Sequence, residues 1–476
     1  MPEASSQQIP SKSVVVVGAG ISGLCVAYWL KQKGIQVTVF EKDSEVGGTM
    51  KTIRDDGWLI ETGPNTALET TPLFQQLFDE LGLTEKRIYT NEVASKRYIV
   101  QAGILQPLPM SPLEFITSPL WTLRGKIRLL KEPFIGRARH EESVAEFVER
   151  RLGKEFLDYA VNPFVAGVFA GDPKQLSVQT AFPKLYALEE QYGSLIKGMI
   201  KSRKERKQRK EQAKDRPKMF SFMDGMQTLP KVLSEKLGSS LKLNATVEQI
   251  IPMRAGRFPI YTVYYNQNEM RLTVQADVVV LATPAYTTAE IIRPIDPEMA
   301  RTLSSIYYPP VAEVFMGFKQ EQVKQQLDGF GFLVPEVEQK KILGTLWSSA
   351  LFPHRAPEGH IALTTFVGGA RQPDLTSRDD EELKRLVLHE LQSLMKIEGS
   401  PVYSRIIRWE KVIPQYNLGY YKILQAIEMF EKNFQGAFLC SNYKGGISVG
   451  DCVMSGEKIS KMIEKFFGPN LETKTH

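Results

Sequence analysis

A glycine-rich turn stands directly after a short apolar run near the start of the chain. The run is 13–17, and the turn consists of Gly18, Ala19, Gly20, Ile21, Ser22 and Gly23. In a turn with this spacing, the first glycine permits a tight reversal, the second lets a pyrophosphate approach the backbone, and the third allows helix and strand to pack closely. Main-chain N–H groups at the start of the following helix hold the phosphates. The pattern predicts a dinucleotide-binding turn, and the alternative is a structural turn in an α/β protein that binds no nucleotide.

An acidic residue stands where the ribose of a dinucleotide would lie. Glu41 ends a second apolar run, 37–41, and follows Gly18 by 41 − 18 = 23 residues. A carboxylate at this distance accepts hydrogen bonds from ribose hydroxyls. Between the two runs, residues 21–33 carry helical periodicity and end at Gly34. The segment therefore predicts a strand–helix–strand unit with parallel strands.

Apolar patterns further along predict a nucleotide domain that the chain leaves and re-enters. Helical periodicity covers 72–83, 141–152, 380–396 and 451–466, and strand-like runs cover 241–250, 261–266, 276–284, 311–318, 329–335 and 360–369. We therefore predict an α/β protein with a discontinuous Rossmann-like domain, a mixed-sheet substrate domain and a helical insertion. The predicted ranges are 13–90, 206–290 and 431–468 for the nucleotide domain, 91–205 for the insertion and 291–430 for the substrate domain.

Cysteines and histidines are too few and too scattered to suggest a metal centre. The three cysteines are Cys25, Cys440 and Cys452, and the five histidines show no HxxxH or HExxH spacing. We expect neither a disulfide framework nor a zinc or iron–sulfur site, and a reducing compartment is the simpler interpretation.

The net charge of +6 is concentrated in the segment 201–218, which holds ten basic and three acidic residues. The rest of the chain is close to neutral, so a general nucleic-acid binder is not expected. The segment lacks apolar periodicity and is predicted to be a solvated helix or a mobile loop.

The N-terminal segment argues against a targeting sequence. Residues 1–13 contain no arginine and no apolar run, so neither a secretory signal nor an arginine-rich transit peptide is predicted. No apolar stretch in the chain reaches the roughly 18 residues of a membrane-spanning helix, and we expect a cytoplasmic location.

Three distant segments resemble the FAD-dependent amine oxidase superfamily. Gly47 and Gly48 form a glycine doublet after the second predicted strand, Val247 lies in a strand-like run, and the glycine-rich segment 440–451 precedes a helix. In that superfamily the doublet lies near the phosphates, the middle strand contacts adenine, and the last segment meets the flavin ring at a helix N-terminus. Thr49 departs from the pattern, because an arginine often stands there. The resemblance implies FAD as cofactor, bound by Gly18, Gly20, Ile21, Ser22, Gly23, Glu41, Lys42, Gly47, Gly48, Thr49, Gly63, Pro64, Asn65, Val247, Trp409, Ile447, Ser448 and Val449.

Further segments resemble the family of oxygen-dependent protoporphyrinogen and coproporphyrinogen oxidases. They are 162–173, 183–200, 220–230, 329–349, 364–371 and 413–420, and the resemblance runs from about residue 13 to 467. It implies a tetrapyrrole substrate in haem or chlorophyll synthesis, O2 as acceptor and hydrogen peroxide as by-product. It also implies that Arg97 pairs with a propionate, and that the residues near the pyrrole rings are Gly167, Leu333, Leu346 and Phe366.

Each substrate-site assignment has a structural alternative. Leu333, Leu346 and Phe366 lie on strand-like segments, where packing in a core is the usual role of such residues. Arg97 could form a surface ion pair, and Trp409 could be a packing residue rather than a flavin neighbour. Protoporphyrinogen is a large apolar disc with two carboxylates, so its site needs apolar walls and a cation, and no general base is assigned.

Other functions remain open at this point. Coproporphyrinogen III carries four carboxylates and should require a more basic pocket, so the single matched arginine, Arg97, favours protoporphyrinogen. Amine oxidation and carotenoid desaturation are more distant alternatives. Non-catalytic carriers of prenylated proteins share the fold, but the intact glycine-rich segment at 440–451 argues against that function.

The segment 102–135 combines apolar residues with a following cluster of cations. Its apolar residues precede Arg124, Lys126 and Arg128, a composition that suits an interface with anionic lipid. In related oxidases this region contributes to membrane association, so we predict peripheral membrane contact. The alternative is a cap in which these apolar residues are buried. The oligomeric state stays open, although dimers are common among relatives.

Overall fold

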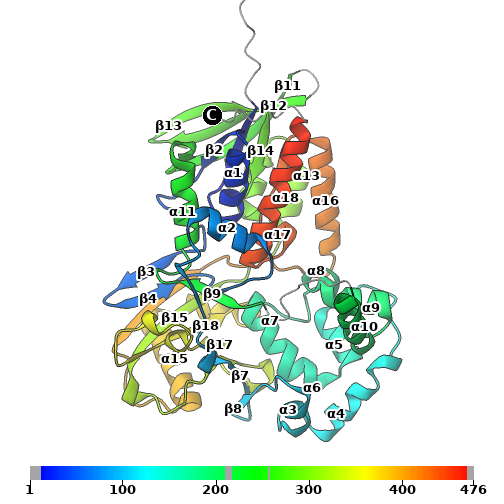
Figure 1. Ribbon diagram of the computed structural model, residues 1–476, viewed down its shortest axis with the longest axis vertical. Coiled ribbons are helices and arrows are strands. Elements are labelled where there is room, and N and C mark those ends of the chain that lie inside the picture. Colours follow the sequence, from blue (N-terminus) through cyan, green and yellow to red (C-terminus); the bar gives the residue numbers. More distant parts are fainter. Residues whose placement is uncertain (1–11, 209–216, 256–257, 469–476) are drawn as a thin grey trace, which may run out of the picture.

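The molecule is built around two large sheets, one in each half along its long axis (Figure 1). The computed structural model describes residues 12–208, 217–255 and 258–468. Part of the basic segment predicted at 201–218 falls in these ranges, because α10 (Leu195–Gln208) includes 201–208, whereas 209–216 lie outside the described residues. Residues 1–11 also lie outside them.

The first sheet is parallel and is built from three distant parts of the chain. Its order is β10–β2–β1–β14–β20, and its strands are β1 (Ser13–Val17), β2 (Gln36–Phe40), β10 (Leu241–Lys242), β14 (Val278–Leu281) and β20 (Ala437–Leu439). Val14 and Val16 pack into the core on one face, and Val15 and Val17 into the core on the other. Burial on both faces explains the unbroken valine run, because parallel sheets are covered on both sides. The predicted discontinuous Rossmann-like domain is confirmed.

Helices and a small sheet cover the two faces of this parallel sheet. One face packs against α1, α2, α11 and α18, and the other against α12, α13, α16 and a three-stranded antiparallel sheet. The helices are α1 (Ile21–Gln32), α2 (Leu73–Leu81), α11 (Thr228–Leu237), α12 (Ala285–Ile292), α13 (Pro297–Ser304), α16 (Tyr420–Asn433) and α18 (Val449–Phe467), and the strands are β11 (Ala245–Ala255), β12 (Phe258–Gln267) and β13 (Met270–Ala276).

The second large sheet is mixed. Its order is β19–β15–β18–β17–β16–β7–β8, and only the pair β16–β7 is parallel. The strands are β7 (Lys96–Gln101), β8 (Ile104–Pro107), β15 (Val311–Lys319), β16 (Gly329–Leu333), β17 (Gly344–Leu346), β18 (His360–Gly368) and β19 (Tyr403–Trp409). Helix α15 (Asp380–Met395) covers one face through a shared apolar core. The hairpin of β3 (Thr52–Asp55) and β4 (Trp58–Glu61) packs on the other face.

Helices line one side of the mixed sheet (Figure 1). They are α3 (Pro112–Thr117), α4 (Leu123–Leu130), α5 (Val144–Arg151), α6 (Lys154–Phe156), α7 (Asn162–Phe169), α8 (Val178–Ala181), α9 (Pro183–Tyr192) and α10, and a π-helical turn, Leu157–Val161, joins α6 to α7. The structure differs from the predicted ranges in two places. Strands β7 and β8 fall inside the range predicted as a helical insertion, and α16, predicted in the substrate domain, packs against the nucleotide-binding sheet.

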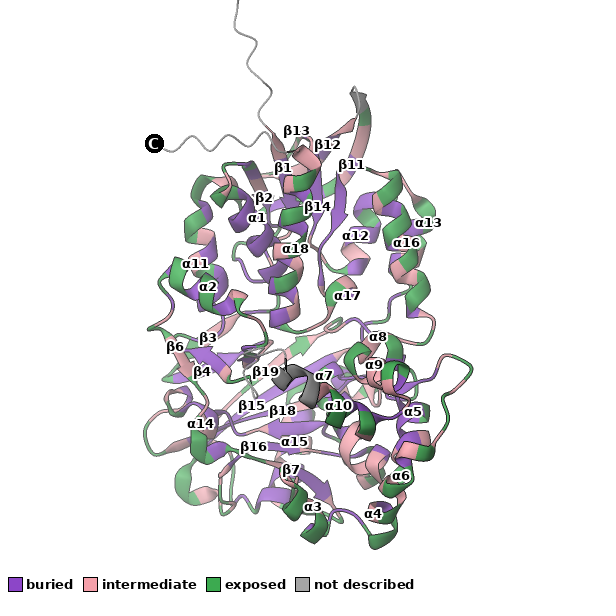
Figure 2. Ribbon diagram, turned by 45° about the vertical axis from the view of Figure 1, so that its right-hand side comes forward, coloured by how far each residue is buried: buried purple, intermediate pink, exposed green. Residues whose placement is uncertain are grey.

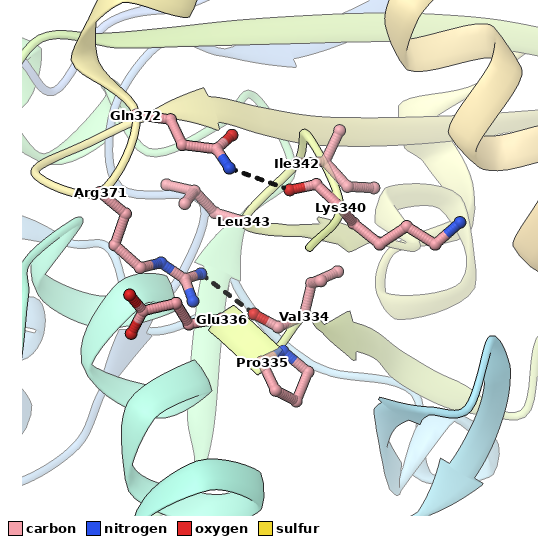
Figure 3. A pocket seen from close by; sticks show the side chains of 8 residues that line it. All are labelled: Val334, Pro335, Glu336, Lys340, Ile342, Leu343, Arg371 and Gln372. Carbon is pink, nitrogen blue, oxygen red and sulfur yellow. Dashed lines mark hydrogen bonds between the residues drawn. The ribbon is translucent and has the colours of Figure 1, made fainter. Parts of the chain in front are cut away.

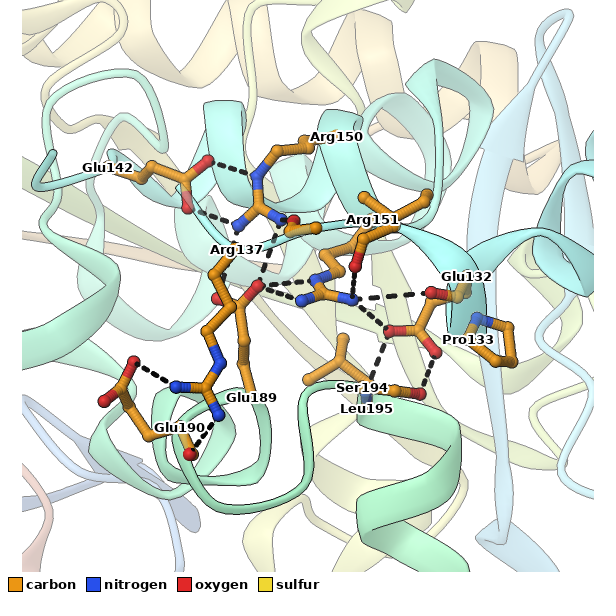
Figure 4. Close-up of polar contacts among 12 residues, drawn as sticks. Glu132, Pro133, Arg137, Glu142, Arg150, Arg151, Glu189, Glu190, Ser194 and Leu195 are labelled. Atoms are coloured by element: carbon orange, nitrogen blue, oxygen red, sulfur yellow. Dashed lines mark hydrogen bonds and ion pairs between the residues drawn. The ribbon is translucent and has the colours of Figure 1, made fainter. Parts of the chain in front are cut away.

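A buried ion network holds these helices together (Figure 4). The Arg151 side chain is fully buried between Glu132 and Glu189, and Arg150 pairs with Glu142 and Glu189. Burial alone would raise the pKa of Glu132, but hydrogen bonds from the Ser194 hydroxyl and the first N–H groups of α10, together with Arg151, lower it. Each buried charge is paired, and this pairing is what makes such burial tolerable.

Candidate functional site

The predicted dinucleotide-binding turn lies at the carboxyl end of β1, where α1 begins. Gly18 has φ +100° and donates its N–H to the Phe40 carbonyl at 2.8 Å. A Cβ atom on Gly23 would collide with the Gly18 carbonyl oxygen. These two glycines are therefore required by the packing of strand and helix, whatever the turn binds.

Gly20 is different, because its surroundings are open. A Cβ atom there would meet no protein atom within 4 Å. Its backbone lies beside that of Gly47 as a parallel bridge, and the Gly47 N–H donates to the Ala19 carbonyl at 2.9 Å. Gly48 follows with φ +60°. Two glycine segments thus meet beside the start of α1, which no side chain caps, and this arrangement forms a cradle that fits a pyrophosphate.

Glu41 lies against the same turn. Its carboxylate accepts the Ala19 N–H at 2.7 Å and the Asp43 N–H at 3.0 Å, and the residue is buried. The Ala245 N–H at the start of β11 donates to the Glu41 carbonyl, which brings the strand containing Val247 beside this region. The remaining acceptor capacity of the carboxylate suits ribose hydroxyls.

The two cations near the glycine doublet take different positions. Lys42 is exposed, and Lys51 lies 3.6 Å from the Asp43 carboxylate. Thr49, which departs from the family pattern, is exposed beside Gly48. Lys51 therefore has a carboxylate partner within the protein.

The turn 61–65 joins the nucleotide-binding half to the mixed sheet. Arg355 is buried and donates to the Glu61 carboxylate and to the Asn65 carbonyl, both at 3.0 Å. Trp409 donates its indole N–H to the Thr62 carbonyl at 2.6 Å. A Cβ atom on Gly63 would collide with the Thr49 carbonyl oxygen, so this turn and the glycine doublet lie in close contact. Sequence reasoning missed Arg355, because no local motif marks a residue whose partners lie about 290 positions away along the chain.

The C-terminal glycine-rich segment returns to α1. After α17 (Asn442–Gly445), Gly446 has φ +112°, and Ser448 caps α18 by accepting the Asp451 N–H. A Cβ atom on Gly456 would lie 2.8 Å from the Cys25 side chain, so α18 crosses α1 closely, as Figure 1 shows. Ile447, Ser448 and Val449 therefore stand at a helix N-terminus, whose dipole favours an electron-rich group.

The predicted substrate residues lie on one face of the mixed sheet. Phe366 pairs with Gly344, and Gly344 with Leu333, so the three form a row across adjacent strands. Leu346 is two residues beyond Gly344 and shares its face. Gly167 on α7 lies over this row, since a Cβ atom there would be 2.5 Å from a Leu333 methyl group.

Arg97 stands at the edge of this row. It is two residues before Ile99, the neighbour of Leu333, and therefore points to the same face of the sheet. Its guanidinium carbon lies 5.9 Å from the centre of the Phe330 ring, and no carboxylate within the described ranges forms an ion pair with it. Leu333, Leu346 and Phe366 are only half-buried. The face thus offers an apolar strip with a cation at one end.

A small cavity lies beside this strip, and polar residues on its wall hold α7 in place (Figure 3). Its volume is about 90 Å³, too small for a tetrapyrrole, because ligand pockets usually reach about 300 Å³ or more. Arg371 on its wall donates to the Asn162 side chain at 2.9 Å and to the Val334 carbonyl at 3.0 Å. The Glu336 N–H donates to the same Asn162 oxygen. These bonds tie the start of α7 to the end of β16 and so place Gly167 over Leu333.

Acidic, histidine and cysteine side chains do not gather into a metal-binding group anywhere in the part of the chain that the structure describes. Cys25, Cys440 and Cys452 are buried and form no disulfide.

The open surroundings of Gly20 permit a clean test of the cradle. We expect Gly20→Val to fold normally, because its backbone has φ −70° and its side chain meets open space, yet to retain at least about tenfold less flavin. The measurements are flavin absorbance per protein and the thermal midpoint of the flavin-free form. Gly23→Val is the contrasting variant and should lower that midpoint. A normal flavin content in Gly20→Val would contradict the assignment.

Comparisons with known proteins place this geometry in a family. The family described as flavin containing amine oxidoreductase matches residues 21–463. Protoporphyrinogen oxidase 2 of Arabidopsis thaliana is 36% identical over 96% of this chain and 94% of its own length, and coproporphyrinogen III oxidase of Bacillus subtilis is 27% identical over 94% and 96%. A crystal structure of a candidate protoporphyrinogen oxidase from Exiguobacterium sp. 255-15 superposes with a TM-score of 0.78, at 24% identity, over 96% of this chain and 100% of that one. The chain therefore belongs to the flavin-containing amine oxidoreductase family, and its relatives by sequence include the protoporphyrinogen and coproporphyrinogen oxidases.

Proposed function

We propose that this FAD-dependent oxidoreductase converts protoporphyrinogen IX to protoporphyrin IX, with O2 as the electron acceptor and hydrogen peroxide as product. The observation that carries the proposal is the half-buried apolar strip of Leu333, Leu346 and Phe366 with Arg97 at its edge, on the sheet face to which the turn 61–65 is anchored. The identity of 36% to a plant protoporphyrinogen oxidase supports the same substrate.

The protein's own contribution is to bind, orient and shield the substrate. Bound FAD supplies hydride acceptance and is reoxidised by O2, so removal of six hydrogens corresponds to three turnovers of the cofactor. Leu333 and Phe366 provide walls for flat apolar rings, and the lack of a side chain on Gly167 lets α7 pack closely against Leu333. Arg97 pairs with a propionate and sets the direction in which the disc enters.

Coproporphyrinogen III is the second candidate substrate, because relatives of that function are 27% and 29% identical over 94% of this chain. The two substrates differ in their number of carboxylates, and hence in the number of cations that their site should contain. The decisive experiment compares the growth of porphyrin fluorescence in air with equal concentrations of each substrate. We expect faster turnover of protoporphyrinogen IX; faster turnover of coproporphyrinogen III would reject the first substrate and keep the cofactor chemistry.

The role of Arg97 can be tested separately from cofactor binding. We expect Arg97→Ala to raise KM roughly 10- to 100-fold, the loss of one charged hydrogen bond, with flavin content unchanged. Lys96→Ala is the matched control, because Lys96 is the preceding residue of β7, points to the opposite face and pairs with Asp328 at 2.6 Å. An unchanged KM in Arg97→Ala, or an equal rise in both variants, would remove the propionate role.

We also propose that α3, α4 and the turn after them rest on an anionic membrane surface. Leu113, Ile116, Leu123, Leu130 and Phe134 are between 66% and 86% exposed, and Figure 2 shows α3 and α4 exposed at one end of the molecule. The cations Arg124 and Lys131 are exposed beside them, whereas Lys126 and Arg128 are half-buried and donate to backbone carbonyls. Leu120 and Trp121 behave differently, because they are buried against Ile99. Within the described residues no helix has the length and apolar character needed to cross a bilayer, so contact at the surface is the mode proposed.

Vesicle flotation tests this surface. We expect wild-type protein to float with vesicles that contain phosphatidylglycerol, and L123E/L130E to bind them at least about 100-fold more weakly, because two buried leucines contribute about 1.5–3 kcal/mol each. Met270→Glu is the control, since Met270 is 58% exposed on β13 at the opposite end of the molecule (Figure 2). If the wild-type protein stays with the unbound fraction, or if L123E/L130E floats equally well, the proposed contact is wrong.

A further inference from the structure

Glu313 on β15 is a buried carboxyl group without a hydrogen-bond partner. It is 2% exposed, its Oε1 is fully buried, and no described residue donates to it. Buried polar groups in proteins are nearly always hydrogen-bonded, because leaving one unpaired costs about 1–3 kcal/mol. The glutamate therefore requires an explanation that packing alone does not provide.

The position of Glu313 on the sheet places it between the substrate strip and the flavin turn. Residues alternate in facing along β15, so Glu313 shares a face with Val311 and Phe315. Val311 packs with Ala166 and Leu343 beside Phe366, whereas Phe315 packs with Trp58 and Ile60 of β4. The direct neighbours of Glu313 across the sheet are Phe366 on β18 and Ile407 on β19.

One buried guanidinium lies near two acidic groups in this region but bonds directly to only one of them. Arg355 pairs directly with Glu61 at 3.0 Å and donates to the Asn65 carbonyl and the Ser221 hydroxyl, whereas its Nε is buried without a hydrogen-bond partner among the described residues. Glu61 also accepts the Met226 N–H and the Thr52 hydroxyl, and these bonds with Arg355 oppose the effect of burial, which still raises its pKa. Glu313 receives none of these bonds.

The surroundings of Glu313 favour its protonated form. Burial raises its pKa well above the ordinary range, the nearby Glu61 charge adds to the rise, and Arg355 only partly opposes it. The raised pKa favours the protonated form, and a protonated carboxyl keeps an O–H group that can donate a hydrogen bond.

We propose that Glu313 is a further catalytic residue, which donates a hydrogen bond to the ring of the bound flavin from the sheet face shared with Phe366. The inference rests on the proposed function in one respect, namely that the flavin ring binds between the turn 61–65 and this face of the sheet. A donor there stabilises the electron-rich reduced ring and so favours hydride acceptance, without adding a charge to an apolar site.

The experiment compares Glu313→Met, which removes the donor at similar length, with Glu313→Gln, which keeps one. Glu390→Met is the control, because Glu390 is a buried acid on α15, on the opposite face of the sheet, and pairs with Lys340. In the flavin-loaded proteins we expect Glu313→Met to show a lower midpoint potential, a shifted visible spectrum and a kcat reduced roughly tenfold with KM nearly unchanged. Glu313→Gln and Glu390→Met should stay close to wild type in all four quantities.

The potential and the spectrum are measured without a substrate, so they test Glu313 even if the tetrapyrrole assignment fails. Wild-type potential and spectrum in Glu313→Met would overturn the proposal, and so would an equal change in Glu313→Gln. Infrared difference spectra on flavin photoreduction give a second measurement that does not depend on how Glu313→Met folds. We expect a protonated-carboxyl C=O band that is lost in Glu313→Gln, and the absence of any such band in the wild type would also overturn the proposal.

Discussion

The ion pair between Arg355 and Glu61 is the contact on which the arrangement of the two halves depends. Arg355 follows β17 in the mixed-sheet half, whereas Glu61, Asn65 and Ser221 belong to segments that lead to and from the nucleotide-binding half. Because both charges are buried, separating them would leave each without a partner, at a cost of about 3–5 kcal/mol. The pair therefore holds the turn 61–65 against the segment that follows β17.

The two halves of the molecule use different kinds of sheet, one to bind phosphates and the other to form an apolar surface. The parallel sheet presents its carboxyl ends, where backbone N–H groups and a helix N-terminus are free to hold phosphates. The mixed sheet instead presents a broad face, and cross-strand register lines up side chains from separate strands on it. Phe366, Gly344 and Leu333 are 22 and 11 residues apart in the chain, yet they are direct neighbours on that face.

The helices beside the mixed sheet combine a rigid interior with an apolar exterior. Arg151 and its acidic partners fix the turn after α4 to α5, α9 and α10 from inside. Outside, leucines of α3 and α4 remain exposed. A flexible apolar segment would collapse onto the protein, so a network of buried charges is a physical means of keeping these side chains turned outward.

Local spacing in the sequence was sufficient to predict the fold of the nucleotide-binding unit. The residues from 13 to 41 interact mainly with near neighbours, so their pattern of valines, glycines and a glutamate predicts both the strand–helix–strand unit and the position of the cradle. Three strands of the mixed sheet, β15, β16 and β18, were also predicted from their apolar runs, since alternation and length are properties of each segment alone. Resemblance to a family pointed to Arg97, Gly167, Leu333, Leu346 and Phe366, and the structure places them on or over one face.

Only the tertiary structure determined the pairing and the polar contacts between distant segments. That β7 and β8 extend the mixed sheet depends on the partner of each strand, which no periodicity specifies. The roles of Arg355, Arg371 and Asn162 depend on hydrogen bonds to residues far away in the chain, and a lone polar residue in a sequence carries no sign of such partners. Glu313 is the clearest case. In the sequence it interrupts an apolar strand, and only burial beside an arginine already paired with Glu61 raises its pKa, because a pKa depends on surroundings that fold from many segments at once.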